Sequence, residues 1–160
     1  MLCKTLIFPV IDYGNMFWSQ GPKAGVTRMQ RLQNRAGRIV LMCHRRTHIQ
    51  DIHDRLQWES CAGRCNLNTC IMVGKCILGE TPTYLDSIFS FVHTRHGYRT
   101  RAVDNKCVSL PLTLSNSAQN MFAYTGAVLW NDLPPPIRHS VDFIDFKHKC
   151  KAHFRAHSVI

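Results

Sequence analysis

The stretch that decides the fold class is Val26-Thr-Arg-Met-Gln-Arg-Leu-Gln-Asn-Arg-Ala-Gly-Arg-Ile-Val-Leu-Met-Cys43. At about 100° per residue its apolar side chains fall within one arc, which is the pattern of an amphipathic helix. Its arginines fall on a separate arc. The apolar arc holds Met29, Leu32, Ala36, Ile39, Val40 and Cys43, and the basic arc holds Arg28, Arg31, Arg35 and Arg38. The sequence therefore predicts a helix with a basic stripe, which Arg45 and Arg46 extend past its end.

Helical patterns also dominate the rest of the chain. Before the first long helix, residues 2–17 predict a short helix containing Pro9, and Gly21, Pro22 and Gly25 predict a loop. After it, the further predicted helices are residues 49–56, residues 58–78 with Gly79 as the C-cap, a short helix that follows Thr81 and Pro82, and residues 120–131.

The last predicted helix follows the turn Leu133-Pro134-Pro135-Pro136. Ser140 is its expected N-cap, and Phe143, Phe146, Cys150 and Phe154 are its expected buried face. Residues 93–106 are polar and basic and predict a loop. The fold class is therefore mainly α, a small helical assembly with one short extended or β-hairpin segment around residues 107–114.

Composition indicates what kind of partner the chain binds. Its 160 residues fit one domain or a domain fragment, and 45% of them are hydrophobic, which is enough for a core. Twenty Lys and Arg against ten Asp and Glu give a net charge of +10. This imbalance favours nucleic acid as a partner, with an anionic membrane surface as the weaker alternative. Without a signal peptide or a membrane-length apolar run, we expect an intracellular protein, nuclear or cytoplasmic and not secreted.

Several short motifs, taken together and in order, resemble one family. They are Pro9-Val10-Ile11-Asp12-Tyr13-Gly14 with Trp18-Ser19, Leu32-Gln33-Asn34-Arg35-Ala36-Gly37-Arg38, Leu56-Gln57-Trp58 with Arg64, Lys75 to Leu78, Pro82-Thr83-Tyr84-Leu85, Arg95 to Arg101, and Leu129-Trp130-Asn131-Asp132-Leu133-Pro134 with Ile137-Arg138 and Phe146-Lys147. The pattern resembles the region after the polymerase core of LINE-type (non-LTR) retrotransposon reverse transcriptases, including jockey-like elements. It covers nearly the whole chain.

This resemblance implies the thumb and C-terminal region of an RNA-directed DNA polymerase, helical and in contact with an RNA–DNA template. Residues 1–56 would be thumb-like helices and residues 57–160 a C-terminal helical region, together one domain or fragment. Met1 lies inside the first thumb-like segment, and the fingers, the palm and any endonuclease domain are not expected in the chain. We therefore expect a truncated remnant, whose further partner would be the missing polymerase core.

Nucleotide polymerisation uses two metal ions held by closely set carboxylates. No two acidic residues are adjacent in the chain, and Asp142 and Asp145, which share one predicted helix face, suit a helix N-terminus. We therefore expect no catalytic residue and no enzymatic activity in this chain, and no cofactor.

The eight cysteines raise a second interpretation. Cys61, Cys65, Cys70 and Cys76 are separated by three, four and five residues, without the C-x-x-C pair that is typical of structural zinc sites. They suit a small apolar position in a core equally well. A Cys/His metal-binding module thus remains an alternative to the nucleic-acid-binding remnant, as does an untranslated or functionless reading frame.

Two candidate nucleic-acid-binding groups follow from the sequence. The first is the basic stripe of Arg28, Arg31, Arg35, Arg38, Arg45 and Arg46, because guanidinium groups bind phosphates bidentately and few acidic residues lie nearby. The second is the loop with Arg95, Arg99 and Arg101 around Tyr98, on which a base could stack. The competing interpretations are a solvated helix face and an ordinary surface aromatic. Trp58, Phe122, Tyr124 and Trp130 are expected in the core.

Overall fold

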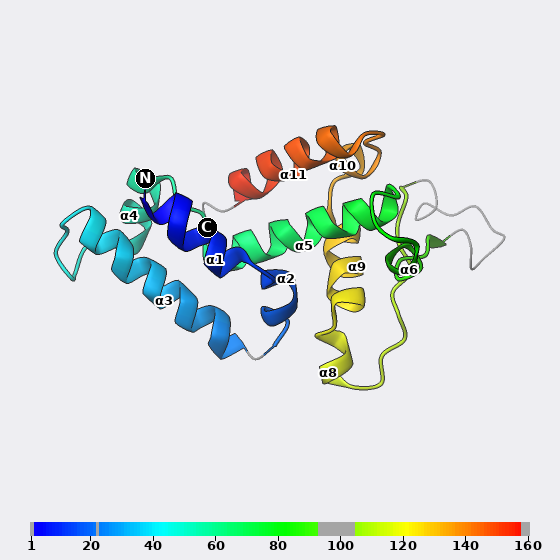
Figure 1. Cartoon of the computed structure of the whole chain (residues 1–160), viewed down its shortest axis with the longest axis horizontal. Coiled ribbons are helices and arrows are strands. Elements are labelled where there is room, and N and C mark those ends of the chain that lie inside the picture. The colour runs from blue at the N-terminus through cyan, green and yellow to red at the C-terminus, as the bar shows by residue number, and fades with distance from the viewer. Residues whose placement is uncertain (1, 22, 93–104, 158–160) are drawn as a thin grey trace.

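The computed structural model describes residues 2–21, 23–92 and 105–157. These residues form helices joined by short connections, so the predicted mainly α fold class is confirmed (Figure 1). Within the described part of the chain there is no sheet. The expected extended segment pairs through a single antiparallel bridge between Val108 and Phe91, with the Ser109 N–H donating to the Ser90 carbonyl oxygen at 2.8 Å.

The central element is the helix α5 (Cys61–Ile77), which runs through the middle of the molecule (Figure 1). It packs against α2 (Asn15–Trp18) and α3 (Lys23–Val40) from the first part of the chain, and against α9 (Phe122–Asp132) and α11 (Phe143–His157) from the last part. One helix thereby joins the N-terminal and C-terminal helices into a common framework.

Local sequence sets both ends of α5. The Ser60 hydroxyl accepts a hydrogen bond from the Gly63 N–H at 3.0 Å and caps the first turn. At the other end Gly79 has φ +74°, and the Glu80 N–H donates to the Lys75 carbonyl oxygen at 2.9 Å. A left-handed residue just after the last turn is a common helix ending, so the predicted role of Gly79 is confirmed.

The apolar core lies where α5, α9 and α11 meet. The rings of Trp130 and Phe146 stack there with centroids 5.4 Å apart. Gly74 permits this packing, because a Cβ at that position would overlap the ring of Phe146. The buried core residues are Leu67, Cys70, Val73, Cys76, Phe89, Val108, Ala127, Trp130, Leu133, Ile137, Phe146 and Cys150. The expected burial of Trp130, Phe146 and Cys150 is confirmed.

The first predicted helix consists of three shorter elements. They are the π-helix η1 (Cys3–Ile7), α1 (Phe8–Asp12) and α2, and Gly14 at φ +61° separates α1 from α2. After α3 the chain forms α4 (Ile49–Leu56), which packs against α3. The N-terminal half of the fold is therefore a group of short helices around one long helix.

Three short helices complete the described part of the chain: α6 (Thr83–Asp86), α8 (Asn116–Gln119) and α10 (Pro135–Arg138). The expected N-cap of the last helix was wrong, because α11 begins at Phe143 rather than next to Ser140. The residues from Pro135 form α10 instead of a simple turn, and this displaces the start of α11. Ser140 is buried after α10 and accepts a 3.4 Å hydrogen bond from Lys149.

The face that α3 buries is not its apolar arc, which corrects the simplest interpretation of its sequence. Leu32 is 54% exposed and Ile39 is 68% exposed, whereas Gln33 and Gly37 are buried. Hydrophobic periodicity assumes that a helix docks through its apolar side chains. Here α3 docks through hydrogen bonds of Gln30 and Gln33 and through the close approach of Gly37 to α4, so the assumption fails for this helix.

Candidate nucleic-acid interface

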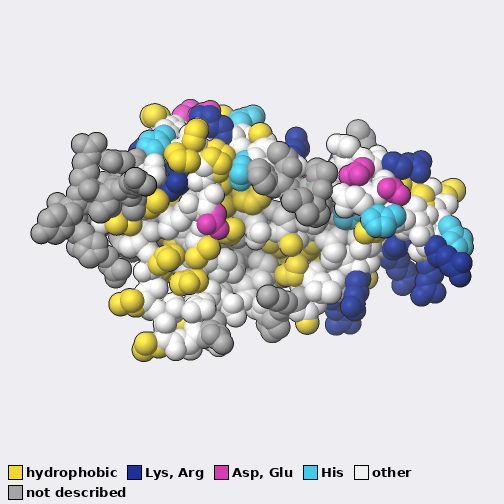
Figure 2. Space-filling view, turned by 180° about the vertical axis from the view of Figure 1, so that it is seen from behind, with side chains coloured by type: hydrophobic (Ala, Val, Ile, Leu, Met, Phe, Trp, Pro, Cys, Tyr) yellow, Lys and Arg dark blue, Asp and Glu magenta, His cyan; other side chains and the backbone are white. Residues whose placement is uncertain are grey.

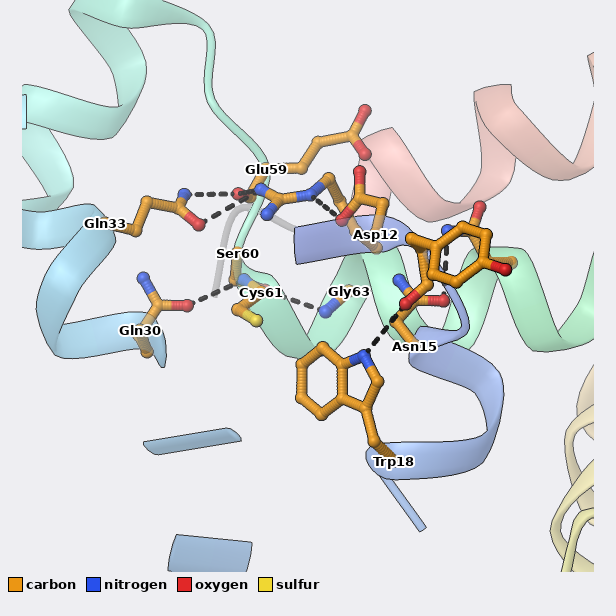
Figure 3. A network of polar contacts seen from close by, with 12 residues as sticks. Asp12, Asn15, Trp18, Gln30, Gln33, Glu59, Ser60, Cys61 and Gly63 are labelled. Carbon is orange, nitrogen blue, oxygen red and sulfur yellow. Dashed lines mark hydrogen bonds and ion pairs between the residues drawn. The ribbon is translucent and has the colours of Figure 1, made fainter. Parts of the chain in front are cut away.

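Polar side chains attach α3 to the segment that connects α4 and α5. The Gln33 amide donates to the Glu59 carbonyl oxygen at 2.7 Å, and the Gln30 side-chain oxygen accepts from the Cys61 N–H at 2.7 Å (Figure 3). The Gln30 amide also donates to the Asn34 side-chain oxygen at 2.8 Å. Because these bonds meet backbone groups with fixed directions, they determine which face of α3 turns inward.

The buried centre of this junction is Arg64, which is only 9% exposed. Its Nε donates to Asp12 at 3.0 Å, and its Nη1 donates to the Gln33 side-chain oxygen at 3.0 Å and to the Glu59 carbonyl oxygen at 3.1 Å. Its guanidinium also lies 4.3 Å from the centroid of the Phe8 ring. One side chain of α5 thus holds α1, α3 and the α4–α5 connection together. We call Asp12, Gln30, Gln33, Glu59 and Arg64 the polar junction.

Two further features tighten this end of the molecule. A Cβ on Gly37 would lie 2.8 Å from Ile52, so only glycine lets α3 and α4 approach this closely. The Asn34 side-chain oxygen also lies 3.0 Å from Nε2 of His53 in α4. Partial burial lowers the pKa of His53, which favours the neutral ring in the folded protein.

With this face of α3 turned inward, the arginines of the basic stripe face outward. Arg28, Arg31 and Arg35 are exposed, and they project from the side of the helix away from Gln33 and Gly37. Figure 2 shows Lys and Arg side chains gathered at the end of the molecule that α3 and α4 form. The helix itself contains no acidic residue. These three arginines therefore lie on an exposed, basic face of α3.

The remaining members of the stripe differ from these three. Arg45 and Arg46 are exposed in the turn after α3, whereas Arg38 is half-buried and its Nε has no hydrogen-bond partner. Within the described part of the chain, none of the six arginines forms an ion pair or a side-chain hydrogen bond. Six positive charges therefore lie along one helix and the following turn without counter-charges, a distribution suited to contacts with phosphates.

The second predicted group cannot be placed in the same way. Arg95, Tyr98, Arg99 and Arg101 lie outside the described residues. Their predicted contacts with nucleic acid stay predictions. The neighbouring residues 105–109 are described, and they rest against α9.

Hydrogen bonds from Trp130 and Asn131 of α9, which we call the polar clamp, hold residues 106–108 in place. The Asn131 side chain accepts from the Val108 N–H at 2.9 Å and donates to the Val108 carbonyl oxygen at 2.9 Å. The indole of Trp130 donates to the Lys106 carbonyl oxygen at 2.9 Å. Residues of the Trp130-Asn131 motif thus fix the backbone of residues 106–108. The sequence analysis expected Trp130 in the core but did not predict this contact.

The cysteines of the alternative metal site lie in or beside the core. Cys61, Cys65, Cys70 and Cys76 are buried on α5, and all eight cysteines are free thiols. A hydrogen bond with Cys65 lowers the pKa of Cys61 to about 7, and the same contact and burial raise the pKa of Cys65. In the described ranges no three His, Cys, Asp or Glu side chains come together in a group that could hold a metal ion.

Asp145, one of the two acidic residues that share a predicted helix face, has a local role in the structure. Asp145 lies in the first turn of α11 and forms an ion pair with Lys149 at 2.6 Å. This hydrogen bond with Lys149 lowers the pKa of Asp145. The arrangement fits a charge at a helix N-terminus.

Comparison with known proteins gives no relative: no protein-family model, no curated protein and no solved structure matches the chain. Among the described helices none combines the length and the apolar character needed to cross a membrane. A function must therefore be inferred from the geometry of this chain and from the motifs that its sequence carries.

Proposed function

We propose that this chain is a non-catalytic, template-holding region similar to the thumb and C-terminal part of a LINE-type reverse transcriptase. It binds RNA or an RNA–DNA hybrid without sequence preference, through the phosphates. The observation that carries this proposal is the row of exposed, unpaired arginines Arg28, Arg31 and Arg35, held outward by the polar face of α3. Arg45 and Arg46 extend the same surface.

The positions of the resembling residues also support the proposal. Asp12, Gln33 and Arg64 come from three separate motifs, and they meet in the polar junction. Trp130 and Asn131 come from the closing motif, and they clamp residues 106–108. Residues of these motifs thus form the polar junction and hold residues 106–108, as expected if the chain shares the architecture of the family. The exposed basic face of α3 takes part in neither contact and is free to contact a ligand.

The charge of the surface indicates the mode of binding. Contacts between arginines and phosphates release condensed counterions, so that affinity falls as salt rises. If all six arginines of the stripe reach phosphates of a single strand, the slope of log affinity against log salt is about −4. Because no base-reading group accompanies the stripe, we expect RNAs of different sequence to bind alike.

Salt titration tests this function. Affinity for a fluorescent single-stranded RNA should fall about 250-fold between ~50 mM and ~200 mM salt, as a slope of about −4 requires. The triple variant Arg28→Gln/Arg31→Gln/Arg35→Gln should flatten the slope by about 2 units. The matched control is Lys106→Gln/Lys147→Gln/Lys149→Gln, which removes equal charge outside α3 and outside the cleft that Lys151 lines. An affinity that does not change with salt, or equal loss in both variants, would contradict a role for this face.

A further proposed partner is the polymerase core, which would cover the apolar surface of the first helices. Leu6 is 64% exposed and Val10 is 75% exposed, in η1 and α1 respectively. Side chains of this kind gather on protein surfaces that bind another protein. The variant Leu6→Ser/Val10→Ser should reduce concentration-dependent aggregation in light scattering while the unfolding transition stays in place. Unchanged aggregation would count against an exposed docking surface here.

A further inference from the structure

A cleft of about 460 Å³ lies where the first and last helices of the chain meet. Lys4 comes from η1, and Lys151 and Arg155 come from α11. Trp58 and Arg64 belong to the α4–α5 connection and to α5. Figure 1 shows the end of α11 beside α1, over the first turns of α5. The cleft falls within the size range of small-molecule sites, roughly 300–1,000 Å³.

The charges around this cleft are unbalanced. Its four basic residues, the three above and Arg64, stand against the two carboxylates of Asp12 and Glu59, which leaves a net charge of +2. Both carboxylates already have partners, since Asp12 lies 3.0 Å from Arg64 and Glu59 lies 3.1 Å from Arg155. A bound anion would therefore supply the missing negative charge.

The two lysines are the free groups of the cleft. Neither Lys4 nor Lys151 forms an ion pair or a side-chain hydrogen bond with any residue in the described part of the chain. They come from opposite ends of the sequence, so an anion between them would join η1 to α11. Arg64 adds to the positive potential, because its buried Nη2 has no acceptor.

An adjoining cavity of about 310 Å³ shows that this charge is local. It shares Lys4 and Arg155 with the cleft, but it adds Asp54 to Glu59, so its two positive and two negative charges cancel. The preference for an anion therefore belongs to the cleft that contains Arg64 and Lys151. The same lysines and arginines oppose a metal cation there.

We propose that this cleft binds a phosphate group, either of a free nucleotide or of the end of a nucleic-acid strand. Ammonium and guanidinium groups are the usual partners of phosphate in proteins. The volume exceeds that of bare phosphate and leaves room for the attached sugar. Its residues are separate from the arginines of the α3 stripe, so the site does not depend on that face.

Binding of inorganic phosphate to the full chain tests the site, followed by amide and indole NMR shifts. The double variant Lys4→Gln/Lys151→Gln should lose affinity about tenfold or more, since each charge-assisted contact contributes about 1 kcal/mol or more. The control Lys106→Gln/Lys147→Gln removes the same charge outside the cleft and should bind as the parent chain does. The Arg28→Gln/Arg31→Gln/Arg35→Gln variant should also keep phosphate binding, even if it loses RNA.

Two further probes distinguish the source of the phosphate. Tighter binding of adenosine 5′-monophosphate than of inorganic phosphate indicates a nucleotide site. Preference for an RNA oligonucleotide with a 5′-phosphate over the same RNA without it indicates a strand end. Phosphate shifts spread over the whole basic surface, or equal losses in the cleft and control variants, would overturn the proposal.

Discussion

The two ends of α5 are held by different forces. At its C-terminal end α9 and α11 bury an apolar core around Trp130 and Phe146, with Cys70, Val73 and Cys150. At its N-terminal end the polar junction joins α1 and α3 to α5 through Arg64 and side-chain amides. Burial of apolar area is non-directional, whereas hydrogen bonds to backbone groups fix orientation. This difference explains why α3, which is held at the N-terminal end of α5, turns a basic face outward and also leaves apolar side chains exposed to solvent.

The largest loss of stability should come from a change in the apolar core at the C-terminal end of α5. Phe146→Ala leaves a cavity against Gly74 and Trp130 and should lower the free energy of unfolding by about 4 kcal/mol. Urea denaturation followed by circular dichroism measures it. Ile144→Ala, at an exposed position two residues away on α11, should change it by less than about 0.5 kcal/mol. Equal small losses in both variants would show that this core does not carry the stability of the fold.

Removal of the Arg64 charge from the polar junction should also lower the free energy of unfolding. Arg64→Met leaves Asp12 and Gln33 without their partner and should cost about 3 kcal/mol. The exposed Arg55→Met, on α4, should cost less than about 0.5 kcal/mol. The double variant Arg64→Met/Asp12→Asn should recover part of the loss, since no carboxylate is left unpaired. A double variant that loses the sum of both single changes would contradict a direct ion pair.

A polar contact also holds the edge of the apolar end. Asn131→Ala removes both hydrogen bonds to buried Val108 and should cost about 2 kcal/mol. Asn120→Ala, at the exposed residue that follows the short helix α8, is the matched control for the loss of an amide. Hydrogen exchange at Val108 should accelerate in the first variant and not in the second. Exchange unchanged in both would refute the clamp.

The smallest effect should appear with pH at the polar end. Burial lowers the pKa of His53 in the folded protein, so the unfolded chain binds more protons as the pH falls below about 6.5. The free energy of unfolding should therefore decrease as the pH is lowered from ~7.5 to ~5.5. His53→Gln should make this decrease smaller, whereas His148→Gln on the exposed side of α11 should leave it as it is. A steeper decrease in His53→Gln would reverse the inferred sign.

Sequence periodicity predicted the apolar end better than the polar one. Phe146, Cys150 and Trp130 follow helical spacing, and burial of large apolar groups is the strongest term in folding. The same rule chose the wrong buried face for α3, because Gln30 and Gln33 compete there through hydrogen bonds to backbone groups. Such pairings join residues far apart in the sequence, and periodicity within one helix contains no information on them.

The candidate site could be predicted only in part, because the spacing of residues within one helix says nothing about contacts between helices. Arg28, Arg31 and Arg35 share a face by helical spacing alone, and their separation from acidic residues is visible in the sequence. The roles of Arg64 and Lys151 could not be predicted in this way. One is a buried partner and the other lines a cleft, and both depend on helices that meet only in the folded chain.

The most direct test of the central claim compares RNA affinity at ~50 mM salt, where contacts with phosphates dominate, in two arginine variants. The Arg28→Gln/Arg31→Gln/Arg35→Gln chain should bind at least about tenfold more weakly while it unfolds at the parent urea concentration. With an RNA that carries no terminal phosphate, Arg64→Met should bind within about twofold of the parent when affinity is corrected for the folded fraction. Equal losses of affinity in Arg64→Met and the triple variant, or unchanged RNA binding by the triple variant, would contradict template binding through this face of α3.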